Sequence, residues 1–405
     1  MNSKSKNAKL VAALLRWFAA HARDLPWRRT RDPYAIWVSE IMLQQTQVKT
    51  VIPFWNRWLQ TLPSIAATAN ASPDQLHKLW EGLGYYTRVR NLQKAAQVVM
   101  AKHGGKFPEN FTDILALPGI GRYTAGAISS IAFNQPTPIL DGNVIRVLTR
   151  LFGISENPKA KTTNAQLWQL AEDLVKDANS SRWGERPREP KFERQRRTAA
   201  REDARPTNCS FLNQSLMELG ALVCTPRNTQ CPICPVKNLC VAFAENRVDE
   251  LPNLGKRETA TARHFMAFVV ERDGKFLVRQ RPAGTVNAHL WEFPNAETTG
   301  AKADAKKIFK AIFGSAPPAV HPLVTVKHSI TRYRITLEAF LVRLGGTSYT
   351  SPHSKKQSGT RGAHPSESIS TTGIWKTPAQ MSLLAFTAAH KKLASAAAKS
   401  ILSGG

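Results

Sequence analysis

The feature that most constrains this 405-residue chain is a change in its hydrophobic pattern near Arg263. Before that point apolar residues recur at helical spacing, and no strand-like alternation of any length occurs before residue 262. After it, residues 264–270 and 275–279 are strand-like, and the Asp273-Gly274 pair between them is a strong hairpin-turn signal. Because the chain is also too long for one core, we expect a helical domain followed by a smaller domain with strands.

One helix start is especially clear in the sequence. In Ser72-Pro73-Asp74-Gln75 the serine can cap a helix, the proline suits its first turn, and the glutamine follows three residues after the cap. We expect this helix to end between residues 82 and 84. Further helices are predicted at residues 40–60, 88–103, 111–117, 123–134, 142–152, 163–178, 211–223 and 385–402, and a further strand at 330–342.

Composition predicts the domain boundaries. We place the helical domain at residues 1–245, a linker at 246–262 and the second domain at 263–405. Residues 182–206 are crowded with Arg and Glu and nearly lack aliphatic side chains, which predicts a solvated basic insertion. Residues 348–372 are rich in Ser, Gly, Thr and His, which predicts a disordered loop.

The charge of the chain is strongly one-sided. It has 56 Lys and Arg against 29 Asp and Glu, a net charge of +27, which predicts a polyanionic partner, nucleic acid ahead of a membrane surface. No apolar run reaches the ~18 residues of a membrane span, and the basic N-terminus has no signal-peptide core. Five cysteines suit a reducing compartment. We expect a bacterial cytoplasmic protein, with the nucleoid and without a membrane partner.

Four of the cysteines form a cluster. Cys224, Cys231, Cys234 and Cys240 have six, two and five residues between them, so their thiolates can converge on one centre. A disulfide framework is a poor explanation, because the only other cysteine is Cys209, interpreted as a free thiol. A structural zinc site and an iron–sulfur cluster both remain, and the spacing does not choose between them.

A glycine turn lies between two of the predicted helices. Gly119 and Gly121, in the sequence LPGIG, allow a tight turn with open backbone N–H groups at the start of the next helix, where a phosphate can bind. A plain helix–helix connector is the alternative, and the basic charge favours phosphate binding. Further along, Asp141 taken alone would be explained as a cap of the helix that follows it.

Together, the glycine turn, Asp141 and the cysteine cluster resemble the helix-hairpin-helix superfamily of DNA glycosylases. The sequences LPWR at residues 25–28, SEIMLQQTQV at 39–48 and GLGYY at 82–86 narrow the resemblance to the MutY-type adenine glycosylases. The match covers roughly residues 9–245, apart from the basic insertion. The sequence LWEFP at residues 290–294 is similar to the family's C-terminal, Nudix-like domain.

This resemblance implies a mainly α helix-hairpin-helix glycosylase domain with an iron–sulfur cluster loop, followed by a smaller α+β Nudix-like domain. It implies a [4Fe–4S] cluster on the four cysteines rather than zinc. The implied activity is base-excision repair by a monomer, which flips and hydrolytically removes adenine opposite 8-oxoguanine or guanine in double-stranded DNA.

The resemblance also implies catalytic roles. Glu40 would protonate the imidazole-ring nitrogen of the extruded adenine and then prepare water, as a buried carboxyl with a raised pKa can near neutral pH. Asp141 would stay ionised and stabilise the oxocarbenium-like sugar, as the second carboxylate does in retaining glycosidases. Tyr123 and Asn143 match positions that orient these groups. Without the family, Glu40 would be interpreted as an exposed helix residue.

Other positions match residues that contact the substrate. Gln45 and Tyr85 match the residues that wedge into the base stack beside the lesion. Trp27, Arg28, Leu43 and Gln214 match the adenine pocket, with ordinary core packing as the alternative for the tryptophan and the leucine. The remaining positions implied to bind DNA are Thr46, Gly119, Gly121, Lys327 and His328.

Three differences from related sequences refine these expectations. Endonuclease-III-type relatives carry a sugar-attacking lysine where this chain has Tyr123, so we expect a monofunctional enzyme without lyase activity. The residues after Pro294 lack the Glu-rich set of Nudix hydrolases, so the second domain is expected to read the oxidised guanine instead. Where the family often has Phe-Ser-His, residues 326–328 are Val-Lys-His, with Ser329 or Lys327 as candidate substitutes.

Two rival functions fit part of the pattern. A glycosylase for thymine mispaired with guanine is disfavoured by Glu40 in its LQQT context. A non-enzymatic iron–sulfur DNA-binding protein is disfavoured because Glu40 and Asp141 are both present.

Overall fold

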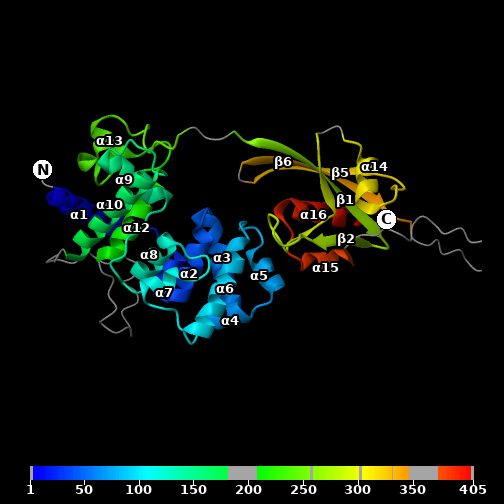
Figure 1. The fold of residues 1–405 in the computed structure, drawn as a ribbon, viewed down its shortest axis with the longest axis horizontal. Helices are drawn as coiled ribbons and strands as arrows, with labels where there is room; N and C mark the ends of the chain where they lie inside the picture. The colour runs from blue at the N-terminus through cyan, green and yellow to red at the C-terminus, as the bar shows by residue number, and fades with distance from the viewer. Residues whose placement is uncertain are drawn as a thin grey trace, which may run out of the picture. The chain divides into compact units, whose positions relative to one another are not determined.

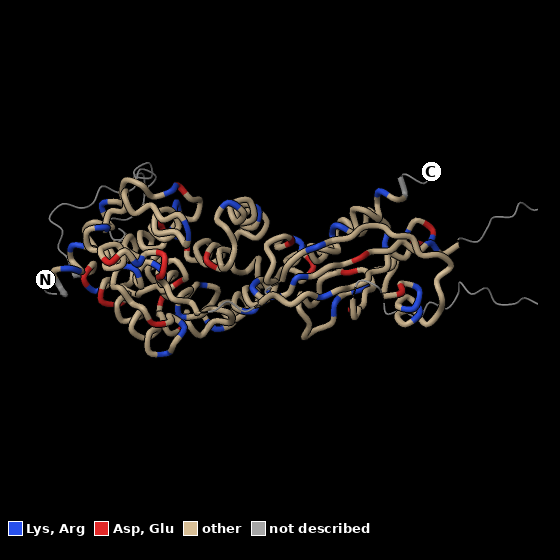
Figure 2. Tube along the Cα trace, turned by 90° about the horizontal axis from the view of Figure 1, so that it is seen from above, with Lys and Arg blue, Asp and Glu red and all other residues tan. Residues whose placement is uncertain are grey.

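The computed structural model describes residues 3–180, 208–255, 259–300, 303–330, 332–345 and 373–402. The chain divides into two compact units, which we call the helical unit (Met1–Ala71 with Arg88–Arg257) and the sheet unit (Ser72–Thr87 with Glu258–Gly405). Neither the insertion predicted at 182–206 nor the loop predicted at 348–372 falls within the described residues. Among the described helices, none combines the length and apolarity that crossing a membrane requires. Lys and Arg lie along both units (Figure 2).

The described part of the helical unit contains helices and loops only. In chain order the helices are α1 (Ser3–His21), η1 (Pro26–Arg29), α2 (Pro33–Leu43), α3 (Val48–Thr61), α4 (Ile65–Asn70), α6 (Thr87–Lys102), α7 (Phe111–Leu115), α8 (Arg122–Ile131), α9 (Gly142–Phe152), α10 (Lys161–Ser180), α12 (Asn208–Leu222), η3 (Cys231–Ile233), η4 (Lys237–Leu239) and α13 (Val241–Ala244).

One core of the helical unit is shared by α1, α9, α10 and α12, which lie together in Figure 1. Leu14, Val147, Leu174 and Leu216, one from each helix, are at most 1% exposed. Burying a side chain of this kind contributes roughly 1.5–3 kcal/mol. This core therefore fixes α9 against α12, and both helices supply residues to the site described below.

Helix α2 packs against α3 and α8 and is buried on almost every side. Asp32 starts the helix by accepting hydrogen bonds from the backbone N–H groups of Tyr34 at 3.1 Å and Ala35 at 3.3 Å. All residues from 34 to 42 are buried, as expected for a helix that is apolar on all faces. Glu40 is the one acidic residue among these buried positions, although glutamate is charged in most environments.

The single helix predicted at residues 40–60 is wrong, because the chain forms two helices there. α2 ends at Leu43, Gln45 takes a left-handed conformation with φ of 55°, and α3 begins at Val48. The side chain of Arg88 stabilises the break: its Nη1 donates to three carbonyls at the end of α2 and in the turn, at 2.6–2.9 Å. The helices predicted at 88–103, 111–117, 123–134, 142–152, 163–178 and 211–223 correspond to α6, α7, α8, α9, α10 and α12.

The sheet unit combines a mixed sheet with helices. Its elements are α5 (Pro73–Trp80), β1 (Thr261–Arg272), β2 (Lys275–Gln280), β3 (Trp291–Glu292), β4 (Asn295–Thr298), α14 (Ala305–Phe313), β5 (His321–Ile330), β6 (Tyr333–Arg343), β7 (Ile374–Lys376), α15 (Pro378–Ser382) and α16 (Ala388–Leu402).

The strands are ordered β3-β2-β1-β6-β5, with β4 also paired to β1 and β7 to β2. β1 and β6 run parallel, with Thr261 opposite Tyr333, and the other pairs are antiparallel. Side chains of β1 alternate between two cores. Ala267 and Val269 pack on the face that α16 covers, whereas Phe268 packs on the face that α14 covers (Figure 1).

The hairpin predicted at Asp273-Gly274 is confirmed, since both residues have positive φ, 52° and 70°, and β1 and β2 pair antiparallel around them. The strand predicted at 330–342 is β6, which begins at Tyr333. The sequence did not predict β5. This strand lies at an edge of the sheet, contains Pro322, and alternates only weakly in burial, all of which weaken a strand pattern.

The helix start predicted at Ser72 is confirmed, because its Oγ accepts a hydrogen bond from the N–H of Gln75 at 3.2 Å. The helix ends earlier than predicted, at Trp80, because Gly82 and Gly84 take positive φ of 113° and 70° in the turn that follows. This helix and turn group with the sheet unit. The domain boundaries predicted from composition stay predictions.

Candidate active site

Glu40 is the central ionisable group of the site. It lies in the last turns of α2 and is only 4% exposed. Tyr123, in the first turn of α8, donates its hydroxyl proton to Glu40 Oε2 at 2.8 Å. Burial raises the pKa of Glu40 from 4.5 to about 7; the hydrogen bond from Tyr123 and the charge of Arg28 oppose this rise, and the charge of Asp141 adds to it. Glu40 can therefore hold its proton near neutral pH.

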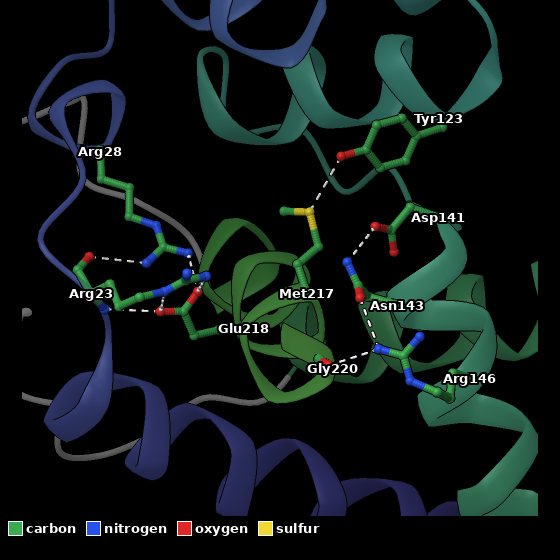
Figure 3. A network of polar contacts seen from close by, with 9 residues as sticks. All are labelled: Arg23, Arg28, Tyr123, Asp141, Asn143, Arg146, Met217, Glu218 and Gly220. Atoms are coloured by element: carbon green, nitrogen blue, oxygen red, sulfur yellow. Dashed lines mark hydrogen bonds and ion pairs between the residues drawn. The ribbon is translucent and has the colours of Figure 1, made fainter. Parts of the chain in front are cut away.

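Asp141 provides the second carboxylate and caps α9. Its Oδ1 accepts the N–H of Val144 at 2.7 Å. Its Oδ2 accepts the side-chain amide of Asn143 at 3.0 Å (Figure 3). Burial raises the pKa of Asp141, and these hydrogen bonds together with the charge of Arg146 act against the rise. The donors all favour the ionised form.

Asn143 is itself fixed from behind. Arg146 Nη2 donates to Asn143 Oδ1 at 2.9 Å and to the carbonyl of Gly220 at 2.7 Å (Figure 3). A Cβ atom at Gly220 would lie 2.7 Å from the Cβ of Asn143, so only glycine lets α12 approach α9 this closely. The close packing of α12 on α9 therefore fixes Asn143, and Asn143 in turn orients the Asp141 carboxylate.

Both carboxylates line one pocket of about 520 Å³ within the helical unit, a size typical of small-molecule sites. Figure 3 shows Tyr123, Met217 and Asp141 facing the same space from α8, α12 and α9. The pocket brings together ten of the residues predicted from sequence: Trp27, Arg28, Glu40, Leu43, Gln45, Thr46, Tyr123, Asp141, Asn143 and Gln214.

Sequence reasoning missed Glu218, which also lines this pocket. It is 1% exposed and accepts hydrogen bonds from Arg23 at 2.7–2.9 Å and from Arg28 at 3.0 Å (Figure 3). Burial alone would raise the pKa of Glu218, but the two arginines lower it to about 2. Glu218 therefore fixes the guanidinium of Arg28 at the pocket wall. Its position four residues after Gln214, on the same face of α12, was the signal that could have found it.

The glycine turn connects α7 to α8. Gly119 has φ of +77°, a conformation that favours glycine. Gly121 precedes the first turn of α8, where no side chain caps the backbone N–H groups and a Cβ atom would meet nothing within 4 Å. Open N–H groups at a helix start are suited to binding a phosphate.

The two wedge positions share an unusual backbone. Gln45, in the helical unit, and Tyr85, in the sheet unit, both have positive φ, 55° and 48°, although neither is glycine. Both side chains are exposed, Tyr85 to 47%. Such strain is retained where surrounding contacts enforce it, and it is common at functional positions.

Lys327 and His328 do not lie in a loop but within β5, opposite Thr336 and Ile335 of β6. Adjacent strand residues point to opposite faces, so the structure does not bring these two side chains together. Lys327 is exposed, as is Ser329. His328 faces the other side, and its Nδ1 is buried without a hydrogen-bond partner among the described residues.

The four clustered cysteines line one small cavity with Arg150. Arg150 Nη1 lies 3.3 Å from Cys224 Sγ, and the Cys240 Sγ lies 3.4 Å from the carbonyl of Arg150. Within the described residues no three His, Cys, Asp or Glu side chains are arranged to hold a single metal ion. Cysteine sulfurs around one cavity are the donor type that an iron–sulfur cluster takes.

Comparison with known proteins agrees with this architecture. A family model described as "HhH-GPD superfamily base excision DNA repair protein" matches residues 38–173, and a NUDIX domain model matches residues 265–396. The fold, with paired carboxylates beside the helix-hairpin-helix turn, is therefore that of a base-excision DNA repair protein with a Nudix-like domain. The chain belongs to the adenine DNA glycosylase family. The resemblance and the fold class inferred from sequence are thereby confirmed.

The similarity to individual relatives extends over most of the chain. The adenine DNA glycosylase of Rattus norvegicus is 35% identical over 390 residues, which cover 82% of this chain and 70% of that protein. That of Arabidopsis thaliana is 38% identical over 335 residues, covering 72% of this chain and 48% of that protein. A solved structure of a thermostable thymine-DNA glycosylase is 28% identical, with a TM-score of 0.49, and covers 60% of this chain and 100% of that one.

Proposed function

We propose that this protein hydrolyses the N-glycosidic bond of adenine opposite 8-oxoguanine or guanine in duplex DNA and leaves the strand intact. The observation that carries the proposal is one pocket lined both by Glu40, whose pKa is about 7, and by Asp141, whose hydrogen bonds favour its ionised form. Glu40 is thus suited to act as the acid, and Asp141 to stabilise positive charge on the sugar.

Substrate binding in this proposal uses three groups of residues. The open N–H groups after Gly121 hold a backbone phosphate, Gln45 and Tyr85 enter the base stack, and the extruded adenine occupies the pocket. Trp27 and Leu43 supply its apolar wall, with Trp27 braced edge-on against Trp55 at a ring distance of 6.1 Å. Binding should weaken steeply with salt, because each phosphate contact releases about one counterion.

In the chemical step Glu40 donates its proton to the imidazole ring of adenine, which turns a poor leaving group into a neutral one. The hydroxyl of Tyr123 holds the Glu40 carboxyl in place. As the sugar gains positive charge, Asp141 stabilises it, and Asn143 keeps the Asp141 carboxylate aimed. Water completes the hydrolysis, with Glu40, now a carboxylate, as its base.

The expectation that the enzyme does not cleave the DNA strand follows from the residues of α8. This helix has the sequence RYTAGAISSI and therefore offers no lysine amine to attack the sugar and form a Schiff base. The phenol of Tyr123 stays protonated, because burial and the nearby carboxylates raise its pKa well above 10.0. A buried neutral phenol is a poor nucleophile and a good hydrogen-bond donor.

The test is release of adenine from synthetic duplexes. We expect adenine release when it is opposite 8-oxoguanine or guanine, with strand breaks only after alkali, since water is the nucleophile. Duplexes with thymine opposite guanine and with adenine opposite thymine serve as controls. Thymine release in place of adenine would refute the substrate, and strand breaks before alkali would refute the monofunctional chemistry.

The sheet unit is proposed to read the base opposite adenine, through the exposed face of β5 with Lys327 and Ser329. An ammonium and a hydroxyl can both bond the carbonyl and ring groups that oxidation changes on guanine. Helix α14 has the sequence AKKIFKAIF, without the carboxylates that nucleotide hydrolysis by a Nudix helix requires. A bacterial, cytoplasmic location beside the nucleoid and a monomeric state stay predictions.

We further propose a [4Fe–4S] cluster bound by Cys224, Cys231, Cys234 and Cys240, where it would tie the segment after α12 to α9 through Arg150. Cys234→Ser should lose visible absorbance in the blue region and most of the iron, about four atoms per chain, because one iron loses its thiolate. Cys209→Ser is the matched control, since Cys209 is fully buried but lies outside this cavity. Stoichiometric zinc without iron in the purified protein would contradict the cluster.

A further inference from the structure

The segment Ser72–Thr87 lies within the helical part of the sequence but belongs to the sheet unit. Lys78 Nζ donates to the carbonyl of Leu384 at 3.1 Å, and Glu81, whose side chain is 6% exposed, makes further bonds to the rest of that unit. Glu81 Oε2 accepts hydrogen bonds from Lys391 Nζ at 2.7 Å and Lys78 Nζ at 3.1 Å, and Oε1 accepts the backbone N–H of Phe386 at 3.1 Å. Three donors thus satisfy a nearly buried carboxylate, which makes these bonds strong.

One of these partners, Phe386, is firmly held by the core of the sheet unit. Phe386 is 2% exposed and stacks on Phe293 with ring centroids 5.9 Å apart. The backbone on both sides of Phe386 pairs with Trp291, whose N–H donates to the carbonyl of Ala385 at 2.9 Å and whose carbonyl accepts from Thr387 at 3.3 Å. Glu81 is therefore bound to a rigid part of the fold rather than to a loose loop.

On its other side Glu81 begins the turn that presents Tyr85. Within this turn the N–H of Leu83 donates to the carbonyl of Trp80 at 3.0 Å, and the indole N–H of Trp80 donates to the carbonyl of Gly84 at 3.1 Å. Tyr85 then takes its left-handed conformation, with φ of 48°. Such a conformation persists only where neighbouring contacts fix the chain, and Glu81 supplies such contacts at the start of the turn.

Glu81 has no part in the chemistry proposed above, because it does not line the pocket of Glu40 and Asp141. It is also not needed to end α5, since glycines at 82 and 84 already do so. A buried carboxylate is costly to desolvate, so its position between the core and the turn calls for another role.

We propose that Glu81 is a positioning residue through which the sheet unit holds the Gly82–Tyr86 turn in the conformation that places Tyr85 in the DNA stack. The role assigned to Tyr85 rests on the function proposed above. The holding of the turn by Glu81 does not, and it can be measured on the free protein.

The first measurement is hydrogen exchange of the full-length protein without DNA. In Glu81→Ala the amides of residues 82–86 should exchange about tenfold faster or more, because three charge-assisted hydrogen bonds are lost. Lys391→Met, which removes one donor from an exposed side chain, should give a smaller change in the same residues. Lys310→Met, which removes an exposed charge from α14 of the same unit, should give none. Exchange in α2 should be unchanged in all three variants.

The second measurement connects the turn to catalysis. Glu81→Ala should lower the single-turnover rate of adenine release about five- to tenfold, and this loss should disappear when Tyr85 is already alanine, because the two residues act in one chain of contacts. Unchanged exchange at 82–86 in both Glu81→Ala and Lys391→Met, or a loss that adds fully to that of Tyr85→Ala, would overturn the inference. Failure of the wild type to release adenine would instead refute the proposed function, and the exchange data would still decide the role of Glu81.

Discussion

Glu40→Gln should bind duplex DNA with unchanged affinity but release adenine about 10³-fold more slowly in single turnover. The glutamine has the same shape, and its amide oxygen can still accept the hydroxyl of Tyr123. It has no acidic proton to give, so adenine would have to leave as an anion. The matched control is Glu172→Gln, a carboxylate of α10 that pairs with Lys176 at the surface and should retain full activity. Turnover within a few-fold of wild type in Glu40→Gln would refute its role as the acid.

The same role fixes the pH dependence of the wild type. The acid must be protonated, and burial raises the pKa of Glu40 from 4.5 to about 7. The rate should therefore fall as pH rises through about 7, approaching tenfold per pH unit, whereas an ordinary glutamate would lose its proton well below this range. Tyr123→Phe removes a hydrogen bond that lowers this pKa, so its alkaline limb should move to higher pH. A rate of adenine release that does not change across pH 7 would refute the role of Glu40 as the acid.

Much of the architecture could be predicted because local sequence signals agree with it. The Ser72 cap, the Asp273-Gly274 turn and the helical periodicity of α9 each follow from residues within a few positions of one another. The break between α2 and α3 could not be predicted in this way. It depends on the guanidinium of Arg88, which is more than forty residues away in the chain.

The candidate site shows the same division. Family motifs identified Glu40 and Asp141, but their pKa values depend on burial, which only the packing of α2 among its neighbours provides. The sequence did not predict Glu218, because a glutamate on a helix usually faces solvent. Here it is buried and paired with two arginines that are distant in the sequence. The grouping of Ser72–Thr87 with the sheet unit is still less visible in sequence, since the contacts of Glu81 span more than 300 residues.

Asp141→Asn should lower the single-turnover rate of adenine release by about 10²- to 10³-fold while leaving the fold intact. Asparagine caps helices as well as aspartate does, so the bond to the N–H of Val144 can persist, and thermal unfolding should change little. What is lost is the negative charge that faces the sugar as it becomes cationic. Asp304→Asn makes the same change at the cap of α14, outside the pocket, and should leave the rate unaffected.

The pH profile of Asp141→Asn separates this electrostatic role from a merely structural one. In the wild type the rate should also fall at low pH, where Asp141 takes up a proton, and burial places this limb above the ordinary aspartate pKa of 3.8. In the variant that acidic limb should vanish. Its alkaline limb should move to lower pH, because the charge of Asp141 raises the pKa of Glu40. A variant that keeps both limbs in place, or that matches the wild-type rate, would show that Asp141 only caps its helix.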